Sequence, residues 1–295
     1  MLHGVVVITG KPNVGKSTFI NNLLNKKIVI TSPKPQTTRD AIGVLYRDEK
    51  RIVEFIDTPG YHIPHNKLDI HLNTQIINSY KRAEASLLFI DLTRPIDNED
   101  EDVIKNLQKI KIKNIIVVFT KYDLSSDNKV ETYKQKLATY GNFGEYIVIS
   151  NKTKFQYDLL LSTLDKYLTN VNGETLPTAS PLTDNFTISE IVREQVIFNT
   201  KQELPYSTAV IIDSNIYDKA SNVLTIHASI IVEKESQKPI IIGAKGSMIK
   251  KIGTIARKEL LKIFNCAIVL KLFVKVEKDW RNNSHLLKSF GYKDN

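Results

Sequence analysis

Apolar runs alternate with amphipathic segments along the first 170 residues. The apolar runs predict strands at 4–9, 42–47, 52–57, 85–91, 114–120 and 146–150. Because they are nearly continuous, they are typical of a parallel sheet that is buried on both faces. The segments between them predict helices near 16–25, 70–83, 99–109, 129–139 and 154–169. A short DEK turn joins the second and third strands, so that pair predicts an antiparallel hairpin. The pattern as a whole predicts an α/β, doubly wound fold.

The pattern changes after residue 170. The stretch VNGETLPTASPLT (171–183) is polar and carries one glycine and two prolines, so it predicts a linker. Beyond it the order of predicted elements is αββααβ, typical of a small α+β module. These elements are a helix near 185–200, strands at 207–213 and 223–234, helical segments within 240–264, and a strand at 267–277. We therefore expect a first domain over 1–170 and a second over 184–295.

Composition supports two packed domains. The chain has 295 residues, of which 42% are hydrophobic and 25% charged, close to globular norms. The net charge is +9, and residues 245–281 hold 10 Lys and Arg against 3 Asp and Glu. Such a local excess indicates either an ordinary solvated surface or a face that binds a polyanion, and the bias favours the second.

Two negative features concern the compartment. Cys266 is the single cysteine, so an intramolecular disulfide is excluded and a reducing compartment fits. The segment MLHGVVVITG has no basic region or cleavage site, and it predicts a first strand and not a signal peptide. No stretch approaches the length of a membrane span.

A phosphate-binding motif follows the first strand and opens a helix. The motif GKPNVGKST comprises Gly10, Lys11, Pro12, Asn13, Val14, Gly15, Lys16, Ser17 and Thr18. Its backbone amides and the helix N-terminus suit phosphates. Lys16 is expected to reach the β- and γ-phosphates, and Ser17 to offer its hydroxyl to Mg²⁺. A plain glycine-rich turn is the alternative, and the strand-to-helix position disfavours it.

Two further segments suit the γ-phosphate and its metal ion. DTPGY comprises Asp57, Thr58, Pro59, Gly60 and Tyr61. Asp57 is expected to hold Mg²⁺, and the Gly60 amide to reach the γ-phosphate. In KPQTTRD we favour Thr38 as the threonine that closes over the metal, with Thr37 as the alternative.

Two strand ends predict recognition of guanine. TKYD comprises Thr120, Lys121, Tyr122 and Asp123. The Asp123 carboxylate can accept two hydrogen bonds from guanine that adenine cannot supply, and the Lys121 stem can pack on the ring. SNK, comprising Ser150, Asn151 and Lys152, can offer backbone amides to the guanine oxygen. An aspartate after a strand is commonly a helix N-cap, but the order of all these motifs makes coincidence remote.

A Gly-x-x-Gly loop lies between two helical segments of the second domain. It comprises Gly243, Ala244, Lys245 and Gly246, and Lys250, Lys251 and Arg257 follow it. KH domains hold the sugar-phosphate backbone at such a loop, where a Cβ would block close approach. A lone Gly-x-x-Gly is a weak signal and can be a helix–helix turn, but the basic helix and the αββααβ order favour RNA binding.

With these motifs in place, nearly the whole chain resembles the Era family, GTPases with a KH domain that act in assembly of the small ribosomal subunit. GKPNVGKST, SPKPQTTRD, DTPGY, GAKG and KVEKDWR carry the resemblance. It implies a monomeric P-loop GTPase domain followed by a type II KH domain. It also implies GTP and GDP as ligands, Mg²⁺ as cofactor, and 16S ribosomal RNA near its 3′ end and the 30S subunit as partners. A cytoplasmic location, with peripheral association at the cell membrane, would follow.

This sequence departs from the Era pattern at two positions. Thr120 replaces the usual asparagine, whose amide braces the P-loop and base, so a lower nucleotide affinity is expected. Asn151 replaces an alanine, and the backbone contact to the base should survive that change.

Tyr61 stands where other GTPases carry the glutamine that orients water. The resemblance implies that K⁺, tied to Asn13, does the electrostatic work, that switch backbone positions the water, and that intrinsic hydrolysis is slow. The alternative from another class is a non-catalytic RNA-binding assembly factor whose GTP site is a sensor. A third alternative is a translation factor that delivers its ligand to the ribosome. It lacks support, because the sequence predicts no further β-barrel domain.

Three other features receive ordinary structural interpretations. The acidic run DNEDED (97–102) is expected at a helix N-terminus, where carboxylates suit the helix dipole. Trp280 should pack at the end of the last strand. His62, His65 and His71 are expected to be solvated.

Overall fold

The structure is a computed structural model that describes residues 1–25, 42–58, 64–112, 114–170, 184–201 and 203–292. The chain divides into two compact units, one formed by 1–63 and 72–181 and the other by 64–71 and 182–295. The expected linker 171–183 lies outside the described residues.

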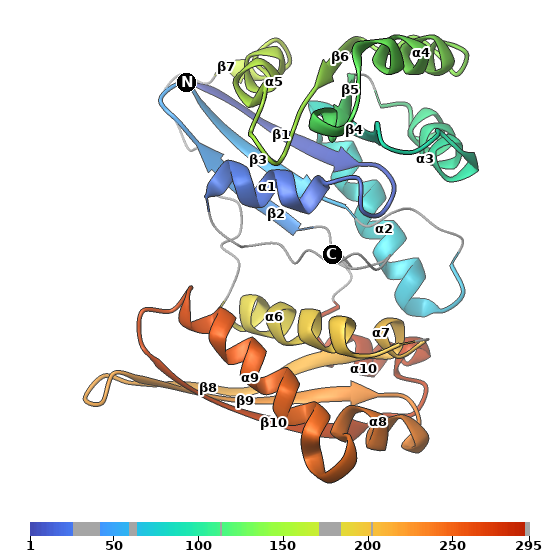
Figure 1. Cartoon of the computed structure of the whole chain (residues 1–295). Helices are drawn as coiled ribbons and strands as arrows, with labels where there is room; N and C mark the ends of the chain where they lie inside the picture. Colours follow the sequence, from blue (N-terminus) through green and yellow to red (C-terminus); the bar gives the residue numbers. More distant parts are fainter. Residues whose placement is uncertain (26–41, 59–63, 113, 171–183, 202, 293–295) are drawn as a thin grey trace. The chain divides into compact units, whose positions relative to one another are not determined.

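The first unit is built on one sheet with strand order β2-β3-β1-β4-β5-β6 (Figure 1). The strands are β1 (Leu2–Thr9), β2 (Ile42–Arg47), β3 (Arg51–Asp57), β4 (Ala85–Asp91), β5 (Ile115–Thr120) and β6 (Glu145–Val148). The pairs β1–β3, β1–β4, β4–β5 and β5–β6 are parallel, and β2–β3 is antiparallel. The doubly wound fold and its hairpin are therefore confirmed.

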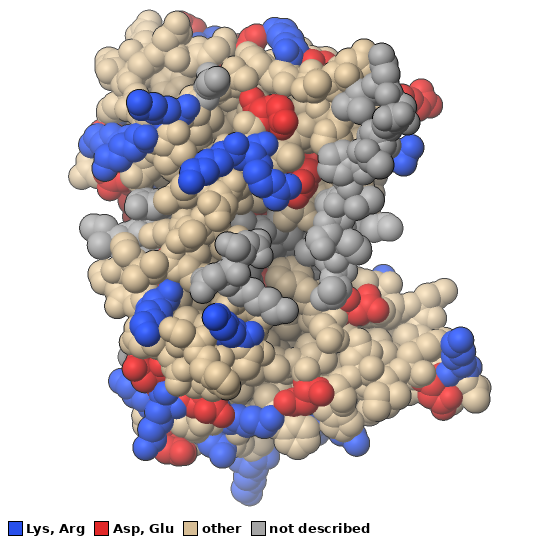
Figure 2. Space-filling model, turned by 180° about the vertical axis from the view of Figure 1, so that it is seen from behind, with Lys and Arg blue, Asp and Glu red and all other residues tan. Residues whose placement is uncertain are grey.

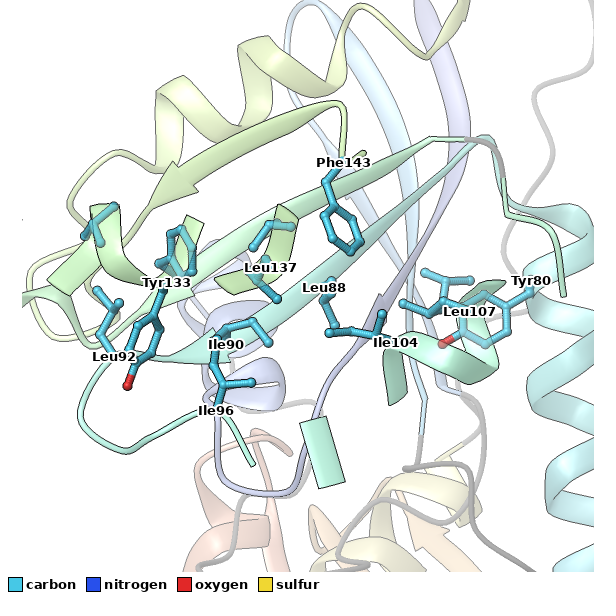
Figure 3. Close-up of a cluster of buried hydrophobic side chains, with 14 of the residues drawn as sticks. Tyr80, Leu88, Ile90, Leu92, Ile96, Ile104, Leu107, Tyr133, Leu137 and Phe143 are labelled. Carbon is cyan, nitrogen blue, oxygen red and sulfur yellow. The ribbon is translucent and has the colours of Figure 1, made fainter. Parts of the chain in front are cut away.

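Helices cover both faces of this sheet. They are α1 (Lys16–Leu24), α2 (Lys67–Arg82), α3 (Asn98–Lys109), α4 (Asp127–Ala138) and α5 (Tyr157–Leu164), with the 3₁₀ turn η1 (Tyr122–Leu124). On one face, side chains of α2, α3 and α4 such as Tyr80, Ile104 and Leu137 pack on strand residues such as Leu88 (Figure 3). On the other face, the Phe19 ring of α1 contacts the rings of Phe55, Phe89 and Tyr157. Burial of these rings holds α1, and with it the start of the phosphate loop, on the sheet.

The helix expected over 154–169 is shorter than predicted. Lys154 and Gln156 have positive φ, so the helix begins only at Tyr157. At the other end, β7 (Thr169–Asn170) pairs antiparallel with β1, a short strand that the periodicity did not indicate.

The second unit is a three-stranded sheet of order β10-β9-β8 with helices on one face. Its elements are α6 (Asp184–Asn199), α7 (Leu204–Ser207), β8 (Ala209–Asp218), β9 (Val223–Val232), η2 (Glu235–Gln237), α8 (Lys238–Ile242), η3 (Ala244–Gly246), α9 (Ser247–Leu261), β10 (Ala267–Val276), η4 (Trp280–Asn282) and α10 (Ser284–Ser289). Ile188 and Val192 of α6 and Ile252 and Ala256 of α9 pack in one buried cluster with Ile226 and other inward residues of the sheet. The expected αββααβ order is present.

Two local predictions have clear outcomes here. The strand expected over 207–213 begins only at Ala209, because Ser207 ends α7, and it runs on to Asp218. Its pairing with β9 shifts register between Ile212 and Ser214. Trp280 is fully buried, donates from Nε1 to the Ser207 carbonyl at 3.1 Å, and stacks against the Tyr292 ring.

Among the helices described, none is long and apolar enough to cross a membrane.

Candidate functional site

The phosphate loop leaves β1 and enters α1. Lys16 is buried, and its Nζ donates to the carbonyls of Gly10 at 2.8 Å and Lys11 at 2.9 Å. Burial lowers the pKa of Lys16, and the negative charge of Asp57 opposes that shift. The ammonium therefore lies inside the curve of the loop, where it can serve a phosphate.

Two of the three expected metal ligands lie together. Ser17 Oγ donates to Asp57 Oδ2 at 2.6 Å, and Asp57, at the end of β3, is fully buried. A hydroxyl beside a carboxylate is an oxygen set that suits Mg²⁺ once phosphate oxygens complete it. Thr37, Thr38, Pro59, Gly60 and Tyr61 lie outside the described residues.

The phosphate loop is anchored to the start of α3, a contact that sequence reasoning missed. Lys11 Nζ lies 2.6 Å from Asp97 Oδ2 and 3.3 Å from Asp100 Oδ2. Asp97 also caps α3 in a capping box with Asp100, so the helix N-terminus expected there is confirmed. Burial would lower the pKa of Lys11, but the hydrogen bond to Asp97 and the charge of Asp100 outweigh it and raise that pKa.

The candidate base site lies at the ends of β5 and β6. Ser150 is buried, and its hydroxyl donates to Asp123 Oδ1 at 2.7 Å, which orients the carboxylate. Tyr122 and Phe155 stack nearby with ring centroids 5.6 Å apart. The structure thus joins the two segments that the sequence placed at the base, while Lys152 is exposed.

Asp91, at the end of β4, is a site residue that the sequence did not indicate. Its Oδ2 pairs with Lys121 Nζ at 2.6 Å, which holds the lysine stem in place. Burial would raise the pKa of Asp91, but hydrogen bonds from Lys121 and Thr93 hold it below its usual value. Arg94 lies 3.5 Å from the same carboxylate and also donates to the Pro12 carbonyl at 2.9 Å. One carboxylate therefore links the base loop to the phosphate loop.

The two positions that depart from the Era pattern both touch the phosphate loop. Thr120 is fully buried, and its hydroxyl lies 2.7 Å from the carbonyl of Val14 and 3.3 Å from that of Ile90. The Asn151 amide nitrogen donates to the Gly15 carbonyl at 2.9 Å. The expectation for Asn151 concerned its backbone only, and the side-chain contact was missed. Thr58 is buried, and its hydroxyl donates to the Ile8 carbonyl at 3.0 Å. Asn13 has a φ of 64°, in the left-handed region.

In the second unit, the Gly-x-x-Gly loop joins α8 to α9. Gly243 has a φ of +73°, and a Cβ there would lie 2.6 Å from the backbone nitrogen of Met248, so only glycine fits. A Cβ on Gly246 would meet no atom within 4 Å, so that side of the loop is open. Ala244 and Lys245 are exposed at its tip. The loop can therefore admit a backbone phosphate.

Basic residues continue from this loop along α9. Lys250, Lys251 and Arg257 are exposed, while Ile252 and Ala256 face the core. In the part of the chain that the structure describes, none of Lys245, Lys250, Lys251 and Arg257 forms an ion pair. On the face drawn in Figure 2, lysine and arginine side chains stand among acidic ones.

Comparisons with known proteins agree with this geometry. The profile of a family described as 50S ribosome-binding GTPase matches residues 5–121, and that of a KH domain matches residues 203–281. GTPase Era of Ureaplasma parvum is 41% identical over 297 aligned residues, covering 99% of this chain and 98% of that protein. GTPase Era of Lactobacillus helveticus is 37% identical, covering 98% of this chain and 95% of that protein.

Two solved structures match the entire chain. Era of Aquifex aeolicus, a tyrosine-to-alanine variant bound to GDP and AlF₄⁻, has a TM-score of 0.90 at 36% identity, with 100% of both chains covered. A complex of Era with MgGDPNP and nucleotides 1506–1542 of 16S ribosomal RNA has a TM-score of 0.91 at 36% identity, again with 100% of both covered. With a phosphate loop, a candidate guanine site and a KH unit in the same order as these relatives, the chain belongs to the Era family of GTPases.

Proposed function

We propose that this chain binds and hydrolyses GTP in its first unit and binds 16S ribosomal RNA near the 3′ end in its second. Its biological role would be in assembly of the 30S subunit and rRNA maturation. The observation that carries the proposal is the match of 100% of the chain to Era in complex with MgGDPNP and 16S ribosomal RNA nucleotides. We assign the GTPase domain to residues 1–170 and the KH domain to 184–295, joined by 171–183.

The phosphates and Mg²⁺ are assigned to the loop over residues 10–18. Lys16 binds the β- and γ-phosphates, and Ser17 and Asp57 would hold Mg²⁺, which would supply positive charge beside the phosphates when bound. The adjacency of Ser17 and Asp57 supports the metal assignment. Thr38, in preference to Thr37, is assigned as a further Mg²⁺ ligand, and the Gly60 amide is assigned to the γ-phosphate, because of their motifs.

The guanine base is assigned to Asp123, with Lys121 on the ring and residues 150–152 around its oxygen. Support comes from the Ser150 hydroxyl, which donates to Asp123 Oδ1 and holds the carboxylate in place. One lone pair of Oδ1 and both of Oδ2 remain to accept the two guanine donors. Asp123→Asn should weaken GTP binding by about 2–3 kcal/mol, the size of a charged hydrogen bond, because an amide cannot accept both guanine donors.

XTP binding should appear in the same variant, since xanthine offers a carbonyl where guanine offers an amine. Competition of GTP and XTP against a fluorescent guanine nucleotide measures both. A variant that still prefers GTP would remove Asp123 from the base site.

Hydrolysis is proposed to depend on K⁺ held near Asn13, with Tyr61 having no role in positioning water. Turnover by the wild-type chain should slow when Na⁺ replaces K⁺, Asn13→Ala should lose that difference, and Tyr61→Ala should change the rate only modestly. Equal rates in both salts would refute the K⁺ proposal.

A GTP sensor without catalysis is the second candidate function. It is tested by GTP turnover with and without K⁺ and small subunits: no turnover under any condition would favour it.

We further propose a monomer in the cytoplasm, where its RNA partner is, with peripheral contact to the cell membrane through basic residues near the C-terminus. Sedimentation with anionic vesicles tests the membrane contact.

A further inference from the structure

Two side chains from different strand ends hold consecutive peptide groups of the phosphate loop. Thr120, at the end of β5, donates to the Val14 carbonyl at 2.7 Å, and Asn151, beyond β6, donates to the Gly15 carbonyl at 2.9 Å. The carbonyl and N–H of one peptide group lie in a plane and point in opposite directions. Fixing these two carbonyls therefore fixes the direction of the next N–H groups, those of Gly15 and Lys16, which a P-loop turns toward phosphate.

The Asn151 amide is itself held in one orientation. The Tyr157 hydroxyl donates to Asn151 Oδ1 at 2.7 Å, which leaves the amide nitrogen to face Gly15. Asn22 of α1 donates to the Asn151 backbone carbonyl at 2.6 Å. The Tyr157 ring lies edge-on to Phe19 with centroids 4.9 Å apart, and burial raises the pKa of Tyr157 to about 12. A tyrosine hydroxyl is protonated at neutral pH and can donate.

Gly15 admits this amide only because it has no side chain. Its φ is +104°, and a Cβ would lie 2.5 Å from Asn151 Nδ2. The Gly15 carbonyl also accepts the first hydrogen bond of α1 from the Phe19 amide at 2.9 Å. One carbonyl thus joins the phosphate loop, the helix behind it and the loop after β6.

We propose that Asn151, oriented by Tyr157, is a positioning residue for the phosphate loop and acts together with Thr120. The pair divides between two side chains a brace that the Era pattern assigns to one asparagine at position 120. The inference rests on the proposed nucleotide site. Both side chains belong to the segments that are assigned to the base. The conformation of the phosphate loop should therefore depend on the conformation of the base site.

The test compares nucleotides with and without the phosphates that the loop grips. In Asn151→Ala, binding of GDP and GTP should weaken about 10-fold, the effect of one buried hydrogen bond, while GMP should change much less. Tyr157→Phe keeps the aromatic ring but removes the hydrogen bond that orients the Asn151 amide. We expect a smaller loss of GDP affinity than in Asn151→Ala. Competition against a fluorescent guanine nucleotide measures these affinities in the full chain.

Two further variants separate positioning from general destabilisation. Adding Thr120→Asn to Asn151→Ala restores an amide at the loop and should recover most of the lost GDP affinity. Tyr217→Phe is the control, because its hydroxyl donates to Asn222 at 2.8 Å in the second unit, and it should bind GDP as wild type does.

Unchanged GDP affinity in Asn151→Ala, an equal loss for GMP, or no recovery with Thr120→Asn would each overturn the proposal. If Asn151→Ala does not fold, Tyr157→Phe decides, and wild-type GDP affinity in that variant overturns it. A wild-type chain that bound no guanine nucleotide would instead refute the proposed function, and this brace with it.

Discussion

At the scale of single residues, the site is built by charged side chains that each serve two loops. Asp91 pairs with Lys121 and lies near Arg94, and Lys11 pairs with Asp97 and Asp100. Because the ends of these contacts are far apart in the sequence, a change on α3 or after β4 acts on the phosphate loop. We therefore expect substitutions at these residues to alter nucleotide binding even where the side chain is not assigned to the nucleotide.

The pair of Lys11 and Asp97 predicts a stability difference that depends on pH. The hydrogen bond from Lys11 holds the pKa of Asp97 below its usual value. A carboxylate with a lowered pKa stabilises the fold above its unfolded pKa of about 4, and this stabilisation is lost as pH falls through the folded pKa. Asparagine caps helices as well as aspartate does, so Asp97→Asn removes the charge and keeps the cap.

Asp97→Asn should therefore lower the melting temperature slightly at pH 7, and the difference from wild type should shrink as pH falls below about 4. The loss should be at most about 1 kcal/mol, because the Asp97 side chain is 54% exposed and solvent screens the pair. Thermal unfolding across this pH range measures it. A difference that persists in acid would mean that the pair with Lys11 is not its cause.

At the scale of elements, the connection of α8 to α9 determines what the second unit can bind. The tight turn at Gly243 and the open side of Gly246 present exposed backbone, and the first turns of α9 add lysines on the same side. Ile252, Ala256 and Leu260, four residues apart, hold the opposite side of α9 in the core. The loop therefore stands on a fixed support.

Replacing both Ala244 and Lys245 with acidic residues should weaken RNA binding and make the affinity depend less on salt concentration. The two changes place negative charge where phosphates must lie, and log affinity falls with log salt by nearly one for each neutralised phosphate. Binding to small-subunit ribosomal RNA near its 3′ end, measured at several salt concentrations, checks this. Unchanged affinity would show that the Gly-x-x-Gly segment is only a turn.

At the scale of the whole molecule, the two units have separate cores and separate candidate sites. Lys16→Ala should abolish GTP binding, because the ammonium that serves the phosphates is lost, and should leave nucleotide-free RNA binding near wild type. Filter binding of GTP and of RNA by the same preparation tests both. Normal GTP turnover in this variant would remove the P-loop assignment, and lost RNA binding would contradict separate sites.

The sequence by itself determined the order of the main elements, the motif residues and the family, while the short elements β7, α7 and α10 were not predicted. Those features are local: a P-loop is nine consecutive residues, a parallel strand shows as one apolar run, and αββααβ is read from periodicity. Even the antiparallel pairing of β2 and β3 followed from the short turn between them.

Tertiary structure alone decided how the motifs are joined. Asn151 contacts Gly15 across 136 positions, Arg94 contacts Pro12 across 82, and β7 pairs with β1 from the far end of the unit. Such contacts depend on which strands are neighbours in the sheet. The strand order differs from the order in the sequence, and no local sequence pattern encodes it. Positive φ at Lys154 and Gln156 likewise delays α5, because the turn that positions the base loop overrides local helical propensity.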